Sequence, residues 1–588
     1  AADPAPAPAP VETGELAIAV TDAEGDFLVY EVEVDAIELT TVAGDEVRTL
    51  PAESRIDFAA LTDLSELLTV ASVPAGVYDA VRLRLDFADA VVLVQDAAGE
   101  VREATLQDAG GAAPGEMVVD LRLDPDRPVR IGAGAIAGLS LDFDLDASNE
   151  ILSFDPALVQ VEPFVLAMPE IDPTRDLRIH GVLETVAEDG TVEVEVRPWR
   201  RRPATIGTAA FTTDAETVWE IDEAAFVGAP GLEALADAAP GTMVVAAGPV
   251  RDGALVADTV LAGSAVPGVA GDVLKGTVLA RGDDDLLVLG GVRIHAAGGP
   301  DRFLRRAALA VSDQTTVRSR GAGGGTELGD AALSVGARLV TAAVEAPTLE
   351  VAGEPELTVY DASLGTVFLR RSTLTGAVVS ADPFRIDLAR LAGRRPGALD
   401  FAGTGPSAAD DADPVAYEID PGVLGTLGLA DGDLLRLHGR VSEHGVAPPD
   451  FRAETIVDVA AEDRGARLRA RWAAIGGTAD AFTEVSPGRL TVDLAEANAT
   501  LRLRGVRRDV LPEAAGLTLV PADAGPSVFT LREPGGEVRI FADFADFTDA
   551  LLTGLQDGAR VGRLDAEGRY DRSEAQLTAR RVRVQWTQ

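Results

Sequence analysis

The stretch PGTMVVAAGPVRDGALVADTV, residues 240–260, contains the pattern that decides the fold of this 588-residue chain. A glycine precedes a short apolar run, a polar turn follows, and a second run ends in L-x-A-x-x-V. Apolar and β-branched runs of this length, bounded by turn residues, are typical of β-strands. The stretch therefore predicts a β-hairpin.

The same phrase returns along the chain. Copies lie at 431–457 and 557–582, and a weaker copy lies at 335–347. The period is too long for a solenoid repeat and predicts separate modules, each with its own core. The leading glycines follow one another at spacings of 95, 96 and 126 residues: Gly241, Gly336, Gly432 and Gly558.

A second hairpin pattern precedes each copy. It consists of a strand, a polar turn and a strand, at 181–196, 276–289, 374–388 and 475–494. A hairpin, a middle segment and a closing hairpin predict a small barrel of the oligonucleotide/oligosaccharide-binding (OB) type. We expect four such β-modules, at residues 173–270, 271–366, 367–462 and 463–588.

The first part of the chain predicts a β-sandwich domain over residues 13–172. One of its segments, 56–68, has apolar residues at helical spacing and predicts a helical insertion. The predicted fold class is all-β, an N-terminal β-sandwich followed by four small β-barrel modules in a linear array. Strand patterns separated by turn residues lie at 15–20, 27–39, 78–94 and 116–123.

Four phrases of the first unit occur in the order found in a known family. They are LAIAVTDAEGD (16–26), VEVDAIELTT (32–41), FAALTDLSELL (58–68) and VPAGVYDAVRLRL (73–85). Residues 13–170 resemble a domain of unknown function, family 4382, of bacterial and archaeal surface lipoproteins. Glu24 replaces the proline usual in its first turn. The later modules resemble an uncharacterised repeat of exported proteins, and both resemblances imply location and architecture only.

Composition and charge exclude several classes of protein. Cysteine is absent, which excludes disulfides, thiolate metal sites and a cysteine nucleophile. The formal net charge of −45 repels polyanions at long range and disfavours nucleic-acid binding. The sequence has no run of about 18 apolar residues, so no transmembrane helix is predicted.

The first ten residues, AADPAPAPAP, predict an extended segment. Alternating proline and alanine form a stiff spacer of roughly 3 Å per residue. We expect residues 1–12 to tether an exported chain, its signal peptide removed, through a lipid anchor upstream of Ala1. The expected location is extracellular or on the outer-membrane surface. In the alternative, residues 1–20 donate a strand to the next copy and build an extracellular filament.

Two acidic clusters predict a calcium site. One is the turn TDAEGD, and the other is the strand LDFDLD, whose alternating side chains place three aspartates on one face. Calcium takes six to eight oxygen ligands. The alternative is a solvated acidic face with an Asx turn. The candidate ligands are Asp22, Glu24, Asp26, Asp142, Asp144 and Asp146.

Three stretches combine arginine with tryptophan in this acidic chain: RPWRRRP (197–203), RLRARW (467–472) and RRVRVQW (580–586). Arginine stacks on tryptophan and forks onto phosphate or carboxylate groups. The stretches predict contact with anionic surface polysaccharide or lipid head groups, docking to an acidic face of a neighbouring domain or subunit, or solvent-facing edge strands. The candidate surface-binding residues are Arg197, Trp199, Arg200, Arg201 and Arg202.

The residue patterns indicate no catalytic constellation. The four histidines lack zinc-site spacing, and no G-x-S-x-G elbow occurs. The sequence predicts a non-enzymatic, elongated cell-surface protein with a structural or adhesive role and no cofactor other than calcium. A carbohydrate-binding surface protein is a further alternative. The expected partners are other copies of the chain or cell-surface polysaccharide, and not nucleic acid.

Overall fold

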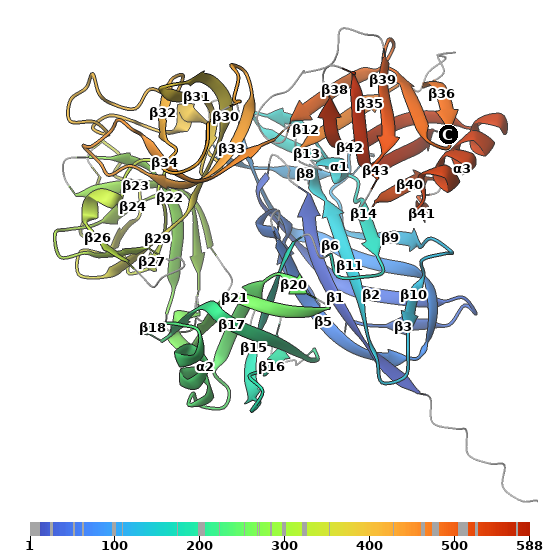
Figure 1. Ribbon diagram of the computed structural model, residues 1–588, viewed down its shortest axis with the longest axis horizontal. Helices are drawn as coiled ribbons and strands as arrows, with labels where there is room; N and C mark the ends of the chain where they lie inside the picture. Colours follow the sequence, from blue (N-terminus) through green and yellow to red (C-terminus); the bar gives the residue numbers. More distant parts are fainter. Residues whose placement is uncertain are drawn as a thin grey trace, which may run out of the picture.

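The computed structural model shows five β-rich domains that follow one another along the chain (Figure 1). The predicted all-β class is confirmed, since strands dominate and helices are few. The structure describes residues 12–587 except 24–26, 51–52, 62–63, 97–100, 109, 173–174, 198–205, 223, 252, 267–268, 270, 283–284, 297–301, 320–325, 352, 427, 460–464, 473–480, 504–515, 524–526, 535 and 572–573.

Two facing sheets form the N-terminal sandwich, and their apolar side chains share one core. The first sheet has the order β14 (Val165–Met168), β11 (Ile136–Asp144), β1 (Thr13–Ala23) and β5 (Leu64–Pro74). The second has the order β3 (Glu46–Arg48), β2 (Phe27–Thr41), β6 (Gly76–Gln95) and β9 (Glu116–Arg122), with β4 (Ser54–Asp57), β7 (Val101–Glu103) and β10 (Val129–Ile131) beside it. A small third sheet and one helical turn complete the domain: β8 (Thr105–Gln107), β12 (Asn149–Phe154), β13 (Ala157–Val161) and α1 (Leu145–Ser148).

The predicted helix at residues 56–68 is wrong. That segment holds a 3-10 turn, η1 (Phe58–Leu61), and the start of β5. Leu68 packs into the core of the sandwich, whereas Leu67 packs into the core of the next domain. A strand buried on both faces loses the apolar–polar alternation that marks strands, and its remaining pattern imitates a helix.

The second domain is a five-stranded barrel. Its strands pair in the order first, second, third, fifth, fourth and back to the first, and the third and fifth strands are parallel. This Greek-key order is that of an OB-type barrel. The five strands are β15 (Asp176–Val186), β16 (Val192–Val196), β17 (Thr208–Ile221), β19 (Met243–Gly248) and β21 (Ala254–Ala262), with β18 (Ala224–Val227), α2 (Ala229–Ala236), β20 (Val250–Arg251) and η2 (Gly263–Ala265) between or after them.

The third and fourth domains repeat this strand order. In the third domain, two strands of the barrel, its third and its fifth, are each interrupted. The strands of the fourth domain form a closed barrel. The third domain contains β22 (Val273–Arg281), β23 (Leu286–His295), β24 (Arg302–Ala310), β25 (Thr316–Ser319), β26 (Thr326–Leu328), η3 (Asp330–Ala332), β27 (Arg338–Ala342), β28 (Val359–Asp361) and β29 (Thr366–Arg370). The fourth contains β30 (Ser372–Ala381), β31 (Phe384–Leu391), η4 (Pro396–Ala398), β32 (Tyr417–Asp420), β33 (Leu434–Val441) and β34 (Phe451–Asp458).

The fifth domain has the same order with its first three strands each divided in two. Helix α3 (Phe544–Gln556) precedes the fourth strand, and the side chain of Asp543 caps its first turn. The strands are β35 (Ala466–Arg471), β36 (Phe482–Ser486), β37 (Arg489–Asp493), β38 (Asn498–Leu503), β39 (Gly516–Pro521), β40 (Val528–Arg532), β41 (Val538–Phe541), β42 (Arg560–Asp571) and β43 (Gln576–Thr587).

The repeated glycine of the sequence has one structural role in all four barrels. It lies two residues before the first residue of the fourth strand. The φ angle of each of these glycines is close to 90°, in a region that only glycine adopts readily. The sequence repeat therefore marks a shared turn. The φ angles are 88° at Gly241, 86° at Gly336, 89° at Gly432 and 93° at Gly558.

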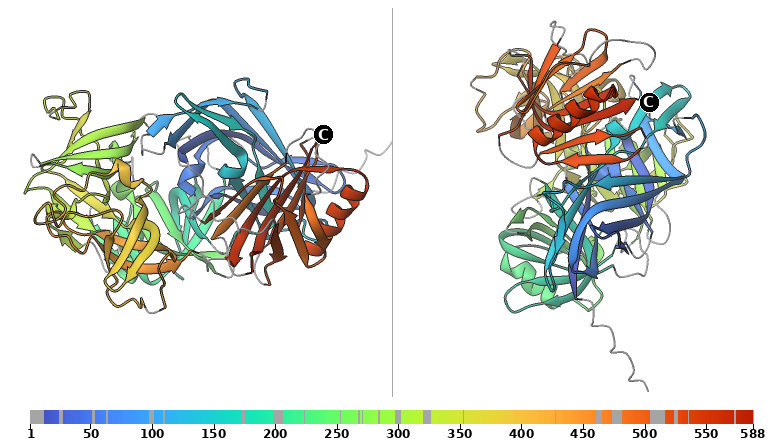
Figure 2. Two further views of the ribbon diagram at one scale, coloured as in Figure 1. Left: turned by 90° about the horizontal axis from the view of Figure 1, so that it is seen from above. Right: turned by 90° about the vertical axis from the view of Figure 1, so that its right-hand side faces the viewer.

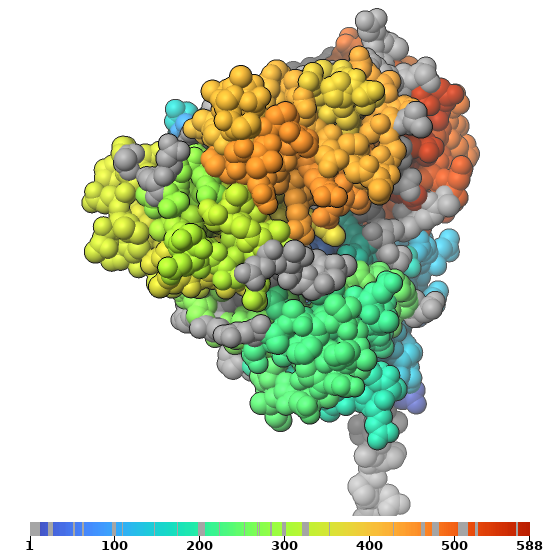
Figure 3. Space-filling view, turned by 60° about the vertical axis from the view of Figure 1, so that its left-hand side comes forward, coloured from blue at the N-terminus to red at the C-terminus, as the bar shows by residue number. Residues whose placement is uncertain are grey.

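In space the five domains form a closed ring, and the expected elongated shape is wrong (Figures 1 and 2). Strand β5 of the sandwich pairs in parallel with β15, and β9 pairs in parallel with β41 of the fifth domain. Figure 3 shows the second, third and fourth domains packed against one another. The first and last domains share a sheet, so two edges of the sandwich are covered by its neighbours.

Candidate functional site

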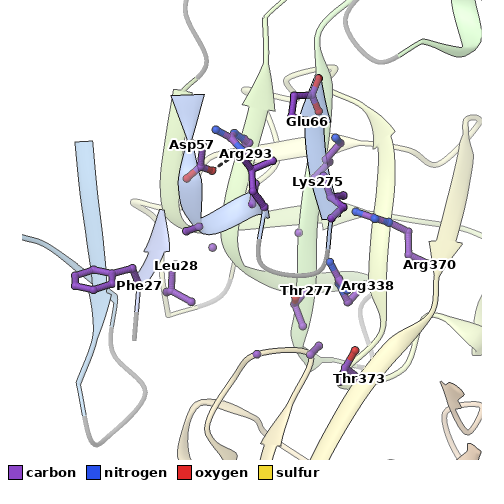
Figure 4. A pocket seen from close by; sticks show the side chains of 18 of the residues that line it. Phe27, Leu28, Asp57, Glu66, Lys275, Thr277, Arg293, Arg338, Arg370 and Thr373 are labelled. Atoms are coloured by element: carbon purple, nitrogen blue, oxygen red, sulfur yellow. Dashed lines mark ion pairs between the residues drawn. The ribbon is translucent and has the colours of Figure 1, made fainter. Parts of the chain in front are cut away.

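A cavity of about 580 Å³ lies where the first four domains meet. Strand β4, the turn η1 and strand β5 of the sandwich line one side, together with Arg178 of β15. Strands of the third and fourth domains line the other side (Figure 4). The volume lies within the range of about 300–1,000 Å³ that is usual for small-molecule sites.

The lining of this cavity is basic, although the whole chain carries a net charge of −45. Among the described residues that line it, nine carry an arginine or lysine side chain and two, Asp57 and Glu66, carry a carboxylate. Positive groups in an enclosed space of low dielectric reinforce one another's potential, which favours an anion. The nine are Arg55, Arg178, Lys275, Arg293, Arg338, Arg370, Arg390, Arg394 and Arg436.

Strand register places like charges opposite each other in the third domain. Lys275 of β22 lies across from Arg293 of β23, and Arg338 of β27 lies across from Arg370 of β29. Like charges directly opposite on antiparallel strands are destabilising. Figure 4 shows Lys275, Arg338 and Arg370 on one wall, whereas Arg293 Nη1 pairs with Asp57 Oδ2 at 2.8 Å.

The fourth domain places a threonine between two arginines. Thr375 of β30 pairs in register with Arg390 of β31 on one side and with Arg436 of β33 on the other. The residue is only 7% exposed, and its Oγ1 has no hydrogen-bond partner within the described part of the chain. A buried hydroxyl without a partner costs about 1–3 kcal/mol. A ligand oxygen that accepts this hydrogen bond would remove that cost.

Arg394 is a buried cation, and two of its side-chain nitrogens donate no hydrogen bond to any described atom. It is 7% exposed, and its Nη2 donates to the carbonyl of Gly290 at 3.2 Å. Its Nε and Nη1 have no partner among the described residues. Burial, followed by the charges of Arg338 and Arg390, lowers the pKa of Arg394 to about 10. Its surroundings therefore disfavour the charge, and its donors suit a phosphate, sulfate or carboxylate.

A tight turn directs Arg394 into the cavity. The backbone N–H of Leu391 donates to the carbonyl of Arg394 at 2.9 Å, and the reverse bond measures 2.8 Å. Between them, Ala392 and Gly393 have φ angles of 52° and 76°. Positive φ at both central residues is typical of a type I′ turn. Ala392 is strained in this conformation, since it is neither glycine nor asparagine, and strain of this kind clusters at functional sites.

Gly291 of β23 leaves the room that Arg394 occupies. The register between β22 and β23 shifts between Lys275 and Thr277, where the facing part of β23 has one extra residue, so Gly291 lies in a bulge, and its φ is 54°. A Cβ atom at this position would lie 1.9 Å from Arg394 Nη2. A side chain here would displace the guanidinium.

Glu66, one of the two carboxylates of the cavity, contacts an arginine and a histidine of the second domain. Its Oε2 accepts from Arg178 Nε at 2.5 Å, and its Oε1 contacts Nδ1 of His180. Burial acts to raise the pKa of Glu66, but the charges of Arg178 and His180 outweigh burial and hold the pKa below its usual value. Burial also lowers the pKa of His180, against the opposing effect of Glu66.

The aspartates expected to bind calcium meet arginines instead. The guanidinium of Arg581 contacts the carboxylate of Asp142, and Arg467 Nη2 donates to both oxygens of Asp144 at 2.6 Å. Both carboxylates are buried. The positive charge that they require is supplied by the fifth domain, so the structure gives no support to calcium at these two residues. In the described ranges, no group of three or more metal-ligating side chains is placed to hold a metal ion.

Asp22 and Asp146 are the other calcium candidates that the structure describes, and they lie in different elements. Asp146 lies in α1 and not in the strand that holds Asp142 and Asp144. Asp22 is paired in β1 with Phe143 of β11. Glu24 and Asp26 lie outside the described residues, and a site in their turn stays a prediction.

Two of the three arginine-rich stretches dock onto the sandwich. Docking to a neighbouring domain is one of the interpretations that the sequence left open for these stretches. From 467–472, Arg471 Nη1 pairs with Glu150 Oε2 at 2.6 Å, beside the Arg467 contact. From 580–586, the guanidinium of Arg583 lies 3.8 Å from the ring centre of Phe164, beside the Arg581 contact. Alternation along β35 and β43 brings these arginines to one face of the fifth domain.

The third stretch and the N-terminal segment lie largely outside the described residues. Arg197 Nη2 pairs with Glu195 Oε2 at 3.4 Å, while Trp199, Arg200, Arg201 and Arg202 lie outside them. The same holds for residues 1–11. In β1, residues 15–20 pair with β11 on one side and with β5 on the other. That part of the expected donor segment already has strand partners within its own chain.

Sequence reasoning missed the cavity because its residues come from different domains. The signal that could have found it is a single cation inside an otherwise apolar strand pattern. Examples are VLKGTV (273–278), which holds the only lysine of the chain, GVRIH (291–295) and LLRLH (434–438). A cation inside a strand of this kind is buried by the fold and requires a partner.

Residues 13–151 match the family model of a domain of unknown function, DUF4382. Comparison with curated proteins gave no match, and comparison with solved structures gave none either. Across the described residues, no helix is long and apolar enough to span a membrane.

Proposed function

We propose that this protein is a non-enzymatic, exported binding protein of the cell surface that holds an anionic ligand in the cavity between its domains. The observation that carries the proposal is that the buried, charged Arg394 has two side-chain nitrogens without a hydrogen-bond acceptor among the described atoms. Thr375, with its unpaired buried hydroxyl in the same lining, supports it independently. Native proteins rarely retain such groups without a ligand or ordered water.

The location is proposed from the first domain. Residues 13–151 match DUF4382, which the sequence resemblance associates with surface lipoproteins. The absence of cysteine and the large negative charge are compatible with an exported protein. A structural or adhesive role is compatible with the closed ring, because a ring fixes the walls of a cavity built from several domains.

The proposed partner is a small anion or an anionic group carried by a cell-surface saccharide. A cavity of about 580 Å³ encloses a small ligand or one segment of a larger one. Arginine is suited to both, because its planar fork matches phosphate, sulfate and carboxylate.

Calorimetric titration with sodium sulfate and sodium phosphate at low ionic strength tests this function. The wild-type protein should bind, and Arg394→Met should bind roughly 10- to 100-fold more weakly, because hydrogen bonds to charged groups are lost. The matched control is Arg452→Gln, which removes an exposed arginine of the same domain outside the cavity. Failure of both anions to bind the wild-type protein would overturn the proposal.

A further inference from the structure

A second pocket, of about 300 Å³, lies at the junction that closes the ring. Strands β12 and β13 of the sandwich line one side, and β42, β43 and the end of β35 in the fifth domain line the other (Figure 1). Across this junction Arg471 Nη1 pairs with Glu150 Oε2 at 2.6 Å. Arg532 Nη1 likewise pairs with Glu162 Oε1 at 2.8 Å. The pocket is therefore complete only when the first and last domains are in contact.

Two tryptophans line this junction pocket, although the whole chain has only four. Trp586 is buried, and its ring packs against helix α3, where a Cβ atom on Gly554 would lie 2.7 Å from its Cζ2. Trp472 is half-buried, and its backbone N–H donates to the carbonyl of Gly562 at 3.0 Å. An indole has apolar faces and one polar N–H, so it suits a ligand with an apolar face and polar edges.

Gly562 is a bulge residue in the lining of the junction pocket. The register between β42 and β43 shifts between Val561 and Arg563, so β42 has one extra residue there. A Cβ atom on Gly562 would lie 2.7 Å from Cγ2 of Thr587. Bulges are over-represented beside active sites, and a glycine within a strand often marks the close approach of a ligand.

The sandwich contributes an amide and a carboxylate to the pocket. Glu150 of β12 and Gln160 of β13 are paired in register, so their side chains lie on one face. Val159 and Val161 belong to the core of the sandwich, and alternation places Gln160 on the opposite face. Side chains of these two types supply donors and acceptors for the hydroxyl groups of a ligand.

The charges of the pocket lining cancel. The described lining carries two arginines and two glutamates, and each of the four has an ion-pair partner. A lining without net charge favours an uncharged ligand, in contrast to the basic central cavity. The pairs are Arg471 with Glu150, Arg532 with Glu162, and Arg563 with Asp565.

One donor of this lining has no acceptor in the described part of the chain. Nε of Arg471 is buried and makes no hydrogen bond there, whereas Nη1 of the same guanidinium donates to Glu150. A buried donor without an acceptor is unfavourable. A hydroxyl oxygen of a ligand can accept this hydrogen bond.

We propose that the junction pocket binds one uncharged sugar ring, with its apolar C–H face against Trp472 and its hydroxyl groups near Arg471, Gln160 and Glu150. A pyranose of about 12 non-hydrogen atoms is compact enough for this pocket. A proline-rich peptide also binds aromatic surfaces, but it extends by about 3 Å per residue and requires a longer groove. The inference goes beyond the proposed function, because it concerns a different pocket and an uncharged ligand.

Saturation-transfer NMR with four neutral sugars tests this inference. The probes are methyl β-D-glucoside, methyl β-D-galactoside, methyl α-D-mannoside and N-acetylglucosamine. At least one should bind with a Kd on the order of 1 mM, the affinity expected for a ligand of this size. Because the sugar is uncharged, its Kd should be the same in about 50 mM and about 500 mM sodium chloride, whereas anion binding in the central cavity should weaken.

Variants locate the bound sugar. Trp472→Ala and Gln160→Ala should each raise its Kd by about 5-fold or more, because an aromatic contact or a hydrogen bond is lost. The matched control is Gln107→Ala, since Gln107 of β8 pairs in register with Gln160 but lies outside the pocket lining. Thermal unfolding without sugar establishes that the variants fold, and Gln160→Ala decides the test if Trp472→Ala loosens the fifth domain.

Three outcomes would overturn the inference. The first is that none of the four sugars binds the wild-type protein. The second is that Gln160→Ala leaves the Kd unchanged or that Gln107→Ala raises it equally. The third is that a synthetic Ala-Pro-Ala-Pro-Ala-Pro peptide binds and no sugar does, which would assign the pocket to a proline-rich segment. The anion-binding function is judged separately, by the sulfate and phosphate titrations.

Discussion

The guanidinium of Arg581, in the last strand of the chain, contacts the carboxylate of Asp142 in a strand of the N-terminal sandwich, and both side chains are buried. Burial alone would lower the pKa of Arg581, but the charges of Asp142 and Glu567 hold it above its usual value. With the β9–β41 pairing, this contact joins the two ends of the ring.

Asp142→Asn is expected to lower the free energy of unfolding of the ring by about 2–3 kcal/mol, because it removes one of the two carboxylates that pair with the buried guanidinium of Arg581 and leaves only Glu567, at 3.5 Å. Chemical unfolding measures the loss, and small-angle X-ray scattering should show a larger radius of gyration if the ring opens. The control is Glu537→Gln, which breaks an exposed pair with Arg122 across the same junction. That pair should contribute no more than about 1 kcal/mol. Equal effects of the two substitutions would contradict the role given to Asp142.

The repeat of hairpins predicts the barrels, because a barrel of this kind is built from local strand pairs. Gly241 and its three counterparts mark the same turn in sequence and in structure. The closure of the ring could not be predicted in the same way. The alternation of side chains along a strand predicts that Asp142 and Arg581 lie on the polar faces of their strands. It does not predict that these two faces meet.

The cavity escaped prediction for a related physical reason. Lys275 and Thr375 lie in strands of two different domains, and their proximity depends on how those domains pack. The type I′ turn that directs Arg394 inward also lacks its usual signal. Its first central residue is Ala392, where asparagine, aspartate or glycine is favoured.

Asp450→Asn is expected to make stability less dependent on pH. Burial raises the pKa of Asp450 to about 6, above the value near 3.9 of an unfolded aspartate, despite the hydrogen bond from the backbone N–H of Glu418 at 2.7 Å. The folded state thus binds this proton more tightly, so the stabilising contribution is complete below about pH 4 and lost as pH rises through about 6. Asparagine keeps an acceptor without the charge, so the variant should be more stable at pH 8 by about 1–2 kcal/mol.

Thermal or urea unfolding at pH 4 and at pH 8 measures this difference. The two proteins should have similar stability at pH 4 and diverge at pH 8. Asp431→Asn, at an exposed position of the same domain, controls for the change in net charge. A variant that is less stable than the wild type at pH 8 would contradict the assignment of a buried, destabilising charge to Asp450.

Gly291→Ala is expected to disturb both stability and anion binding. The new Cβ would lie 1.9 Å from Arg394 Nη2, and the φ of 54° is unfavourable for alanine. The free energy of unfolding should fall by about 2–3 kcal/mol, more than the roughly 1 kcal/mol of the conformational effect alone. Gly445→Ala provides that comparison, because its φ is 80° and no described atom lies within 4 Å of its Cβ position. Only Gly291→Ala should weaken sulfate binding in calorimetry.

Arg394→Met is expected to stabilise the ligand-free protein while removing its response to anions. The lowered pKa of Arg394, about 10, means that the folded state disfavours its charge at every pH below that value. Methionine fills similar space without the charge but loses the hydrogen bond to the Gly290 carbonyl, so a net gain of about 1 kcal/mol is expected. In sulfate the order should reverse, because bound anion stabilises only the wild-type protein in proportion to its saturation. Thermal unfolding in sodium chloride and in sodium sulfate of equal ionic strength measures both effects, with Arg452→Gln as the control. If Arg394→Met proves less stable in both salts, Arg394 is a structural residue, and the anion-binding role argued from its unpaired donors is wrong.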